Sequence, residues 1–542
     1  MTGGEILIRC LEEQGVRRVF GVPGESYLPV LDALYDSSIH MVTARQEGGA
    51  AMMAEADGKL TGRPGICFVT RGPGATNASA GVHVAQQDST PMILFVGQIA
   101  RAHTGRDAFQ EVDYRALFGG MAKAVEEIID PARIPEIISR AYHIAMSGRP
   151  GPVVIALPED MLAEETESAP ARRVEVAEPS PSAAQMDWIV ALLKGAKRPM
   201  VVLGGSRWNT EAVRAMAKIA ESWLLPVTCT FRRQGLFDHE HFCYAGDTGL
   251  GINPALRERL EQADTILMIG ARFSENPSQG FSVLGIPDPG VRLIHVHPGP
   301  EELGRLYAPT LSVNASPGGF LSRMLELTPP GAAPWSDATQ DAHASYLSWS
   351  SESPEAPGAI TMREVIAALA SALPASAVVT NGAGNYASWL HRFFRFRRYG
   401  AQLAPTSGSM GYGLPAAIAA KLAHPDKDVV CLAGDGCLQM SVQEMATAAQ
   451  EGANIIVLVC DNQQYGTIRM HQERSYPARV SGTQLVNPKF VKLAEAYGWF
   501  AEELSAGHEI DDALQRARDA QKPAVLHVKL DPRALAPDVT LS

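Results

Sequence analysis

The chain has 542 residues, too many for one hydrophobic core, and its length predicts about three domains of ~150–200 residues. Its 59 acidic side chains outnumber 47 basic ones, and a net charge of −12 without a basic run argues against a nucleic-acid partner. No uncharged apolar run approaches the ~20 residues of a membrane span, and the charged N-terminal segment does not resemble a signal peptide. Seven scattered cysteines without a Cys-x-x-Cys pair predict a reduced, cytoplasmic protein.

Short apolar strands alternate with helical stretches from the N-terminus to about Leu162. The segments VRRVFGVPG, GICFVTRGPG, PMILFVGQI and GPVVIALPED each predict a buried strand that ends in a turn. Apolar runs without period-two alternation are typical of a parallel sheet that is covered on both faces. We therefore expect an N-terminal domain over residues 1–165.

Two further α/β units follow, each after a polar, proline-rich connector. The second, at residues 184–328, contains RPMVVLGGS and ADTILMIGARF, and the third, at residues 360–532, contains KDVVCLAGDG and ANIIVLVCDN. The connector before the third unit is expected to be a linker with a short helix. Strands that alternate with helices predict an α/β protein of three doubly wound parallel sheets.

Polar side chains end two strands of the third unit. Asp435 lies in Gly434-Asp435-Gly436, and Asn462 follows Asp461, 27 positions after Asp435. Ligands of open α/β sheets bind beyond the carboxyl ends of strands, and carboxylate and amide oxygens suit Mg²⁺, which also binds phosphate oxygens. The pair predicts a diphosphate held through one divalent metal ion. The alternative for Gly-Asp-Gly alone is a turn whose aspartate caps the next helix.

Several co-linear motifs are similar to those of thiamine-diphosphate enzymes of the acetolactate synthase and 2-oxo acid decarboxylase superfamily. They are TARQEGGAAMMAEADGKLTGRPGICFVTRGPGATN, GSMGYGLPAAIAAKLAHP, and a GDG motif followed by an asparagine pair, whose first member is Asp461 here. The resemblance covers essentially the whole chain. It implies an N-terminal domain that binds the cofactor's pyrimidine ring, a central domain, and a C-terminal domain that binds its diphosphate with Mg²⁺.

The resemblance also implies which residues hold the cofactor. Glu47 matches a glutamate that hydrogen-bonds the pyrimidine ring and helps to remove the C2 proton; Met410 matches an apolar wedge that bends the cofactor. Asp435 and Asn462 would ligate the metal through their side chains, and Gln464 through its backbone carbonyl. The other implied cofactor contacts are Pro23, Gly384, Asn385, Tyr386, Gly408, Gly434, Gly436, Tyr465 and Gly466. Without the motifs, Glu47 could be a helix-start carboxylate that accepts backbone donors, and Met410 an ordinary core methionine.

The resemblance extends to the substrate side of the cleft. Phe109 and Gln110 match residues near the second substrate, and Lys123 matches a lysine that positions anionic groups. His471 stands where the family has a tryptophan that selects 2-oxobutyrate. Together with Arg469 it predicts an acceptor more polar than 2-oxobutyrate. The alternative is that these charged and polar side chains are solvated surface groups.

The second domain raises the question of FAD, which acetolactate synthases bind there. GARFSEN at 270–276 keeps only the first half of the corresponding family segment, and His297 stands where an acid would hold the ribose. These departures argue against FAD, so it is an optional cofactor in our interpretation. His295 and His297 share one strand face, but no third residue is spaced to complete a metal site.

We therefore expect a carboligase that decarboxylates a 2-oxo acid, preferably pyruvate, and joins the product to a carbonyl acceptor, as in acetolactate synthesis for branched-chain amino acids. The alternatives are a non-ligating decarboxylase, an FAD-dependent pyruvate oxidase, and acyl transfer of the sulfoacetaldehyde acetyltransferase type. An alternative from another class is a degenerate regulatory paralogue, which the intact Glu47, Asp435 and Asn462 argue against. The resemblance implies a homodimer or homotetramer with sites at the subunit interface, and leaves a regulatory subunit open.

Overall fold

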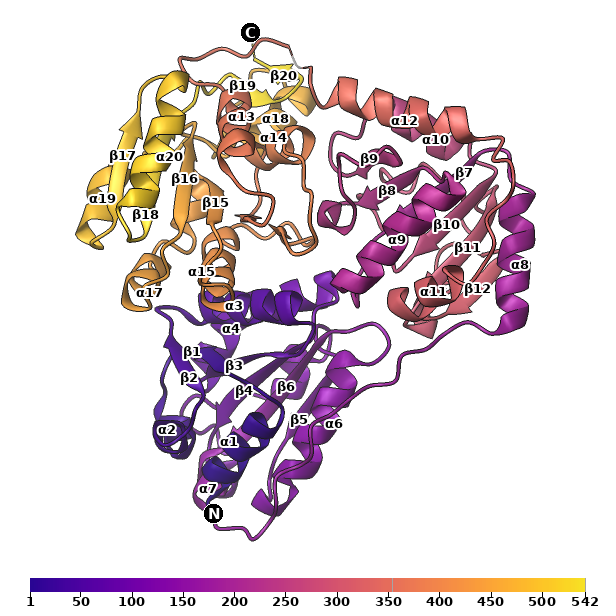
Figure 1. Cartoon of the computed structure of the whole chain (residues 1–542). Helices are drawn as coiled ribbons and strands as arrows, with labels where there is room; N and C mark the ends of the chain where they lie inside the picture. Colours follow the sequence, from indigo (N-terminus) through magenta and orange to yellow (C-terminus); the bar gives the residue numbers. More distant parts are fainter. Residues whose placement is uncertain (353, 542) are drawn as a thin grey trace.

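The computed structural model describes residues 1–352 and 354–541 and contains three six-stranded parallel sheets flanked by helices (Figure 1). Residue 353, in the second predicted connector, and residue 542 lie outside the described residues. The predicted fold class, three doubly wound α/β domains, is confirmed. No helix within the described ranges is long and apolar enough to cross a membrane.

The N-terminal sheet has the strand order β2-β1-β3-β4-β6-β5. Every residue of β3, β4 and β6 is buried because helices cover both faces of these strands. The strands are β1 (Arg18–Gly21), β2 (His40–Thr43), β3 (Gly65–Val69), β4 (Met92–Gln98), β5 (Ala124–Glu127) and β6 (Pro152–Pro158). The helices are α1 (Gly3–Glu13), α2 (Leu28–Tyr35), α3 (Glu47–Thr61), α4 (Gly72–Asp88), α5 (Tyr114–Phe118), α6 (Ile134–Met146) and α7 (Glu159–Ala163).

The central sheet has the order β12-β11-β10-β7-β8-β9. Its strands are β7 (Pro199–Leu203), β8 (Val227–Thr230), β9 (Tyr244–Thr248), β10 (Thr265–Ile269), β11 (Arg292–His297) and β12 (Leu311–Asn314). Its helices are α8 (Ala183–Lys194), α9 (Thr210–Trp223), α10 (Pro254–Glu261) and α11 (Pro317–Met324).

The connector after the central domain holds a helix of 14 residues, α12 (Ser336–Trp349). It packs on β9, where the rings of Tyr346 and Tyr244 lie 4.7 Å apart. The hydroxyl of Thr339 donates to the carbonyl of Leu224 over 2.7 Å. This segment is therefore part of the central domain's packing rather than a free linker, because its buried face covers the sheet edge.

The C-terminal sheet has the order β14-β13-β15-β16-β18-β17, the same topology as the N-terminal sheet. Its strands are β13 (Val378–Asn381), β14 (Gln402–Leu403), β15 (Val429–Gly434), β16 (Ile456–Asp461), β17 (Phe500–Leu504) and β18 (Ala524–Lys529), followed by a hairpin of β19 (Ala534–Ala536) and β20 (Val539–Thr540). Its helices are α13 (Met362–Ala372), α14 (Tyr386–Phe393), α15 (Gly413–Ala423), α16 (Asp435–Gln439), α17 (Glu444–Gln450), α18 (Gly466–Ser475), α19 (Phe490–Ala496) and α20 (Ile510–Asp519). The order reverses between β13 and β15, so a ligand crevice is expected beyond their carboxyl ends.

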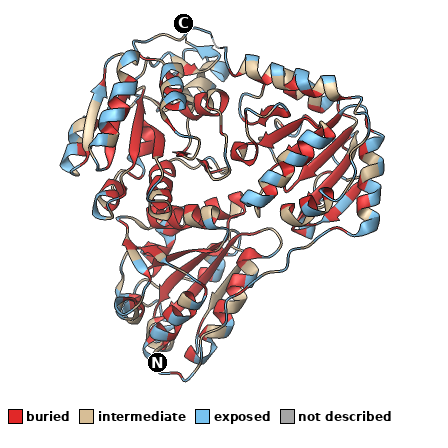
Figure 2. Ribbon diagram, viewed as in Figure 1, coloured by how far each residue is buried: buried red, intermediate tan, exposed pale blue. Residues whose placement is uncertain are grey.

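The first and third domains of the chain share one hydrophobic core cluster. Figure 1 shows α3 lying directly against α15, and both helices are largely buried in Figure 2. Small side chains permit this close approach, among them Ala50 and Ala51 of α3 and Ala416 and Ala417 of α15. The start of α3, where Glu47 lies, is therefore fixed against the C-terminal domain of the same chain.

Candidate active site

The two predicted metal ligands lie side by side at the carboxyl edge of the C-terminal sheet. Strands β15 and β16 pair in parallel with Gly434 opposite Cys460, so Asp435 and Asp461 extend from the same edge. The side-chain nitrogen of Asn487 donates to Asp435 Oδ2 over 2.7 Å and to Asp461 Oδ1 over 2.8 Å. Asn462 directly follows Asp461. The side-chain amide of Asn487 therefore links the two loop tips on which the predicted metal ligands lie.

The aspartate that replaces the first asparagine of the family motif is accommodated by its neighbours. Asp461 is buried and accepts hydrogen bonds from His527 Nε2 at 2.9 Å and from the amide of Gln463 at 3.1 Å. Burial raises its pKa, but bonds from His527, Gln463 and Asn487 hold the pKa below the usual range. Burial, and secondarily the charge of Asp461, raises the pKa of Asp435 to about 6.

Sequence reasoning missed Asn487 and His527, which hold these carboxylates. His527 interrupts the apolar run of β18 from Ala524 to Val528, and that contrast was the available signal. Asn487 lies in a loop with no pattern around it.

The segment after β13 meets both loop tips. Gly384 has a φ of 145°, and a Cβ there would lie 2.7 Å from the Tyr386 ring. That ring also covers Gly434, while Asn385 accepts a hydrogen bond from the hydroxyl of Thr467 over 2.9 Å. Gly436 lies equally close to the ring of Tyr465. The predicted contacts Gly384, Asn385, Tyr386, Gly434, Gly436, Tyr465 and Gly466 are thus gathered at one edge.

The backbone after β16 reverses direction at Gln463, which has a φ of 56°. The carbonyl of Gln464 accepts the amide of Gly466 over 2.9 Å, and no other donor in the described part of the chain bonds this oxygen, which has a second lone pair. Within the described residues, no three His, Cys, Asp or Glu side chains cluster as metal ligands. One carboxylate, one amide and one carbonyl suit a hard cation that keeps water and phosphate oxygens.

The loop with Met410 lies against the same edge. Met410 is half-buried, and Gly408 is exposed with a φ of 69°. The amide of Gly411 donates to Cys437 Sγ over 3.2 Å, two residues beyond Asp435. The loop is therefore beside the predicted diphosphate site.

In the N-terminal domain, the predicted residues gather around the first turns of α4. Glu47, the first residue of α3, accepts a hydrogen bond from Asn77 Nδ2 over 2.9 Å. The carbonyl of Gln110 accepts the amide of Gly72 over 3.2 Å. Pro23 precedes Gly24, where a Cβ would lie 2.6 Å from that of Thr70. Asn77, which sequence reasoning missed, orients the carboxylate of Glu47.

Two predicted substrate contacts are not brought to these clusters within one chain. Lys123 directly precedes β5, at the amino edge of its sheet, and donates to the carbonyls of Ser147 and Arg149, both over 2.8 Å. His471 is exposed on α18 and contacts Arg474. Among the contacts of the described residues, none joins Glu47 to Asp435 or Asn462.

The histidines of the central domain are bonded to their local backbone. His295 Nε2 lies 2.9 Å from the carbonyl of Ala271, and His297 Nδ1 lies 3.0 Å from both the amide and the carbonyl of Gly299. Burial lowers the pKa of His297 to about 4. Neither ring is arranged as a metal ligand.

Two cavities lie beyond the carboxyl ends of the central strands. The cavity between Phe231, Arg272 and Phe273 has a volume of only about 70 Å³, whereas a neighbouring cavity beside the 205–210 loop has about 640 Å³. Ligand pockets usually measure roughly 300–1,000 Å³, so the smaller cavity does not fit a flavin ring system.

Comparison with known proteins defines the class of this three-domain arrangement. Residues 1–117 match the family described as "Thiamine pyrophosphate enzyme, N-terminal TPP binding domain". Residues 186–324 and 382–528 match the central domain and the C-terminal TPP binding domain of the same enzymes. These matches fall on the three sheets in chain order.

Similar individual proteins show to which group of thiamine pyrophosphate enzymes the chain belongs. The chain is 32% identical to the acetolactate synthase large subunit of Corynebacterium glutamicum over 97% of this chain and 86% of that protein. It is 31% identical to the isozyme 2 large subunit of Escherichia coli over 98% and 96%. It is 31% identical to a probable acetolactate synthase large subunit of Methanocaldococcus jannaschii over 99% and 93%. The chain belongs to the acetolactate synthase family of thiamine pyrophosphate enzymes.

Proposed function

We propose that the chain decarboxylates pyruvate and joins the two-carbon product to a second 2-oxo acid, forming 2-acetolactate when pyruvate is also the acceptor. The observation that carries the proposal is the pair of loop tips that bear Asp435 and Asn462 at a sheet's switch point. Asn487 links them, because it bonds Asp435 on one tip and Asp461, the residue before Asn462, on the other. Whole-length similarity to acetolactate synthases supports the choice of reaction.

Bound thiamine diphosphate supplies a carbanion at C2 of its thiazolium ring. Asp435, Asn462 and the carbonyl of Gln464 hold Mg²⁺ and, through it, the diphosphate. The remaining C-terminal cofactor contacts are Gly384, Asn385, Tyr386, Gly408, Gly434, Gly436, Tyr465 and Gly466. Glu47, oriented by Asn77, hydrogen-bonds the pyrimidine ring and promotes removal of the C2 proton. Pro23 lines the pyrimidine end of the site, and Met410 holds the cofactor in its bent shape.

The proposed assembly is at least a homodimer in which each site is shared between two subunits. Two observations support it: no contact among the described residues joins the Glu47 cluster to the Asp435 cluster, and apolar side chains on the segments that carry Gln110 and Arg469 are exposed. Phe109 is 74% exposed beside Gln110, and Ile468 is 53% exposed on α18. Exposed apolar groups around a site favour a protein partner. We place the domain limits at residues 1–165, 184–328 and 360–532, and the enzyme in the cytoplasm.

The proposed acceptor is more polar than 2-oxobutyrate. Arg469 pairs with Glu473 over 2.7 Å, and His471 is exposed two positions after Arg469 on α18. Gln110 and Lys123 are proposed to contact anionic groups after assembly. His471→Trp should shift acceptor preference toward 2-oxobutyrate in competition assays; an unchanged ratio would remove His471 from the specificity site.

The proposed reaction is redox-neutral and does not require FAD. The cavity between Phe231 and Arg272, of about 70 Å³, is too small for a flavin ring system, whereas the neighbouring cavity of about 640 Å³ has the size of a ligand pocket. Absorbance of the purified protein near 450 nm, with and without added FAD, tests this part of the proposal.

Product analysis tests the reaction itself. Purified protein with pyruvate, thiamine diphosphate and Mg²⁺ should form 2-acetolactate and carbon dioxide. Acetaldehyde from pyruvate would instead indicate a simple decarboxylase, and flavin reduction an oxidase. Acetyl phosphate and sulfite formed from sulfoacetaldehyde and phosphate would indicate an acyltransferase. Inertness toward a panel of 2-oxo acids would favour a regulatory paralogue.

A further inference from the structure

Three charged side chains form a buried triad at the junction of the three domains. Glu55 and Lys59 lie on α3, and Asp88 is the last residue of α4. Lys59 Nζ lies 3.1 Å from Glu55 Oε1 and also bonds Asp88 Oδ2. Both carboxylates are inaccessible to solvent, at 0% and 1% exposure. We call Glu55, Lys59 and Asp88 the buried triad.

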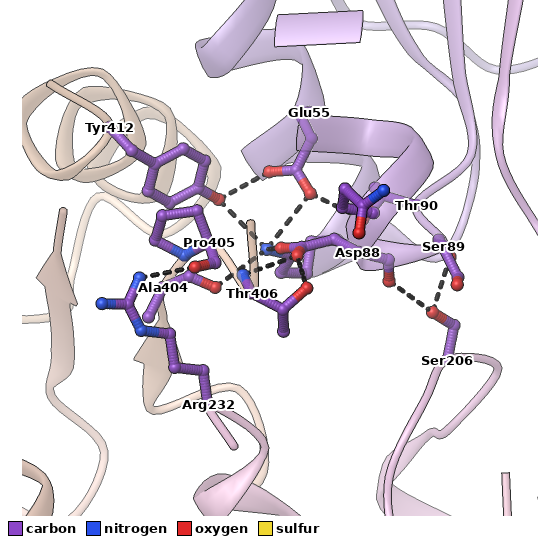
Figure 3. A network of polar contacts seen from close by, with 12 residues as sticks. Glu55, Asp88, Ser89, Thr90, Ser206, Arg232, Ala404, Pro405, Thr406 and Tyr412 are labelled. Carbon is purple, nitrogen blue, oxygen red and sulfur yellow. Dashed lines mark hydrogen bonds and ion pairs between the residues drawn. The ribbon is translucent and has the colours of Figure 1, made fainter. Parts of the chain in front are cut away.

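The buried triad binds both ends of the segment that carries Met410. At one end, Asp88 Oδ1 accepts the amide of Thr406 over 2.6 Å and also its hydroxyl. At the other end, the hydroxyl of Tyr412 donates to Glu55 Oε2 over 2.6 Å. Figure 3 shows the side chains of Thr406 and Tyr412 turned toward the two carboxylates. We refer to residues 405–411 as the Met410 loop.

Side chains of the central domain also form hydrogen bonds at this junction. Arg232 Nη1 donates to the carbonyl of Pro405 over 2.5 Å, at the start of the Met410 loop. Arg233 Nη2 donates to the carbonyl of Asp88 over 2.8 Å. The hydroxyl of Ser206 donates to the carbonyl of Ser89 over 2.5 Å (Figure 3). All three domains therefore contact the start of the loop or its anchor.

Loss of a hydrogen-bond donor to either carboxylate of the buried triad would be costly, because both carboxylates are buried. The two share one lysine, so the second oxygen of each depends on neutral donors: Tyr412 for Glu55 Oε2 and Thr406 for Asp88 Oδ1. The hydroxyl of Thr90 adds a bond of 2.6 Å to Glu55 Oε1, the oxygen that also contacts Lys59. Although burial raises the pKa of Asp88, Lys59, Arg233 and Thr406 hold it below its usual range. A buried charge that loses a donor is strongly penalised, so displacement of Thr406 or Tyr412 is disfavoured.

We infer that Glu55, Lys59 and Asp88 are positioning residues that fix the Met410 loop in the conformation that receives thiamine diphosphate. The middle of the loop lacks such support, since Gly408 is exposed and Met410 is half-buried. The inference rests on the proposed function in one respect, because Met410 is assigned there as a cofactor contact. The anchoring itself depends only on contacts within the chain.

The test compares full-length variants at the loop anchor with a matched control. Thr406→Val removes the hydroxyl that bonds Asp88, and Thr406→Ser retains it. Thr339→Val removes a buried threonine hydroxyl bond in α12, away from the loop. Hydrogen–deuterium exchange of peptides over 404–412 is measured without cofactor, and thiamine diphosphate binding is measured with Mg²⁺ by tryptophan fluorescence.

Thr406→Val should exchange about tenfold faster over 404–412 and bind thiamine diphosphate about tenfold more weakly. Thr406→Ser should restore both values, and Thr339→Val should change neither, with similar Tm values for the two valine variants. Unchanged exchange in Thr406→Val would overturn the anchoring. Faster exchange with unchanged affinity would overturn the positioning role.

Failure of the proposed function gives a different result. A wild-type protein that does not bind thiamine diphosphate contradicts the cofactor assignment. The exchange measurement on the cofactor-free chain still decides whether the buried triad holds the loop.

Discussion

Replacement of Gly49 by alanine tests how the start of α3 is held against the C-terminal domain. A Cβ on Gly49 would lie 2.6 Å from Glu444 Oε1 and 2.8 Å from its Cδ. Glu444 is fully buried and cannot move aside cheaply, because it accepts the amide of Arg45 at 3.2 Å and the hydroxyl of Thr447 at 2.7 Å.

Two costs add in the Gly49→Ala variant. Overpacking costs about 1–3 kcal/mol, and weakening a hydrogen bond to a buried charge costs about 1.5–3 kcal/mol. We therefore expect a loss of roughly 2.5–6 kcal/mol, together with reduced turnover, since Glu47 is two residues away. Calorimetry would show a lower unfolding temperature. This temperature is an apparent value, because a three-domain chain need not unfold in one step.

Gly318→Ala is the control for this substitution. Gly318 lies in α11, and an added Cβ there has no neighbour within 4 Å. That variant should be neutral or more stable by about 0.4–1 kcal/mol. If Gly49→Ala unfolded at the wild-type temperature and kept full turnover, the rigid contact between α3 and Glu444 would be refuted.

Three further predictions concern pH, metal and ligands. Burial raises the pKa of Asp247 to about 7, so its proton is retained on folding, and stability falls as pH rises from about 4 to 7; Asp247→Asn should be more stable than wild type by roughly 2–4 kcal/mol at pH 8. A stability difference that stays constant from pH 5 to 8 in denaturant titrations would contradict this. EDTA should abolish the rise in Tm that thiamine diphosphate produces, and Mg²⁺ should restore it; a rise that persists in EDTA would exclude metal-mediated binding. Asn487→Ala should weaken Mg²⁺ binding at least tenfold in isothermal titration, because Asp435 loses the amide that fixes it, whereas unchanged affinity would show that the bridge has no role.

The sequence was sufficient for the features that repeat locally. Apolar runs identified the inner strands of all three sheets, but not the outermost strands, such as β2 and β5 of the first sheet. A Gly-Asp-Gly turn followed by Asn462 placed two polar tips at strand ends. Parallel pairing of β15 with β16 then brings those tips together, because the carboxyl ends of parallel strands share an edge.

Contacts between distant segments could not be predicted in the same way. Asp88 and Thr406 are separated by 318 positions, and no periodicity links a helix end to a loop. His527 reaches Asp461 because β18 lies beside β16 in the sheet, and Asn487 reaches it from the loop before α19. The place of Lys123 at an amino edge likewise depends on strand order, which single motifs do not reveal.

The central claim is that Asp435 and Asn462 hold a magnesium-bound thiamine diphosphate with which the chain makes 2-acetolactate. The most direct measurement is a stoichiometric assay with labelled pyruvate, in which carbon dioxide and 2-acetolactate are counted together in wild type and in Asp435→Ala. Our account predicts one carbon dioxide and one acetolactate for every two pyruvates, dependent on both cofactors, and neither product from Asp435→Ala. Cofactor-independent product formation, or full activity of Asp435→Ala, would contradict it.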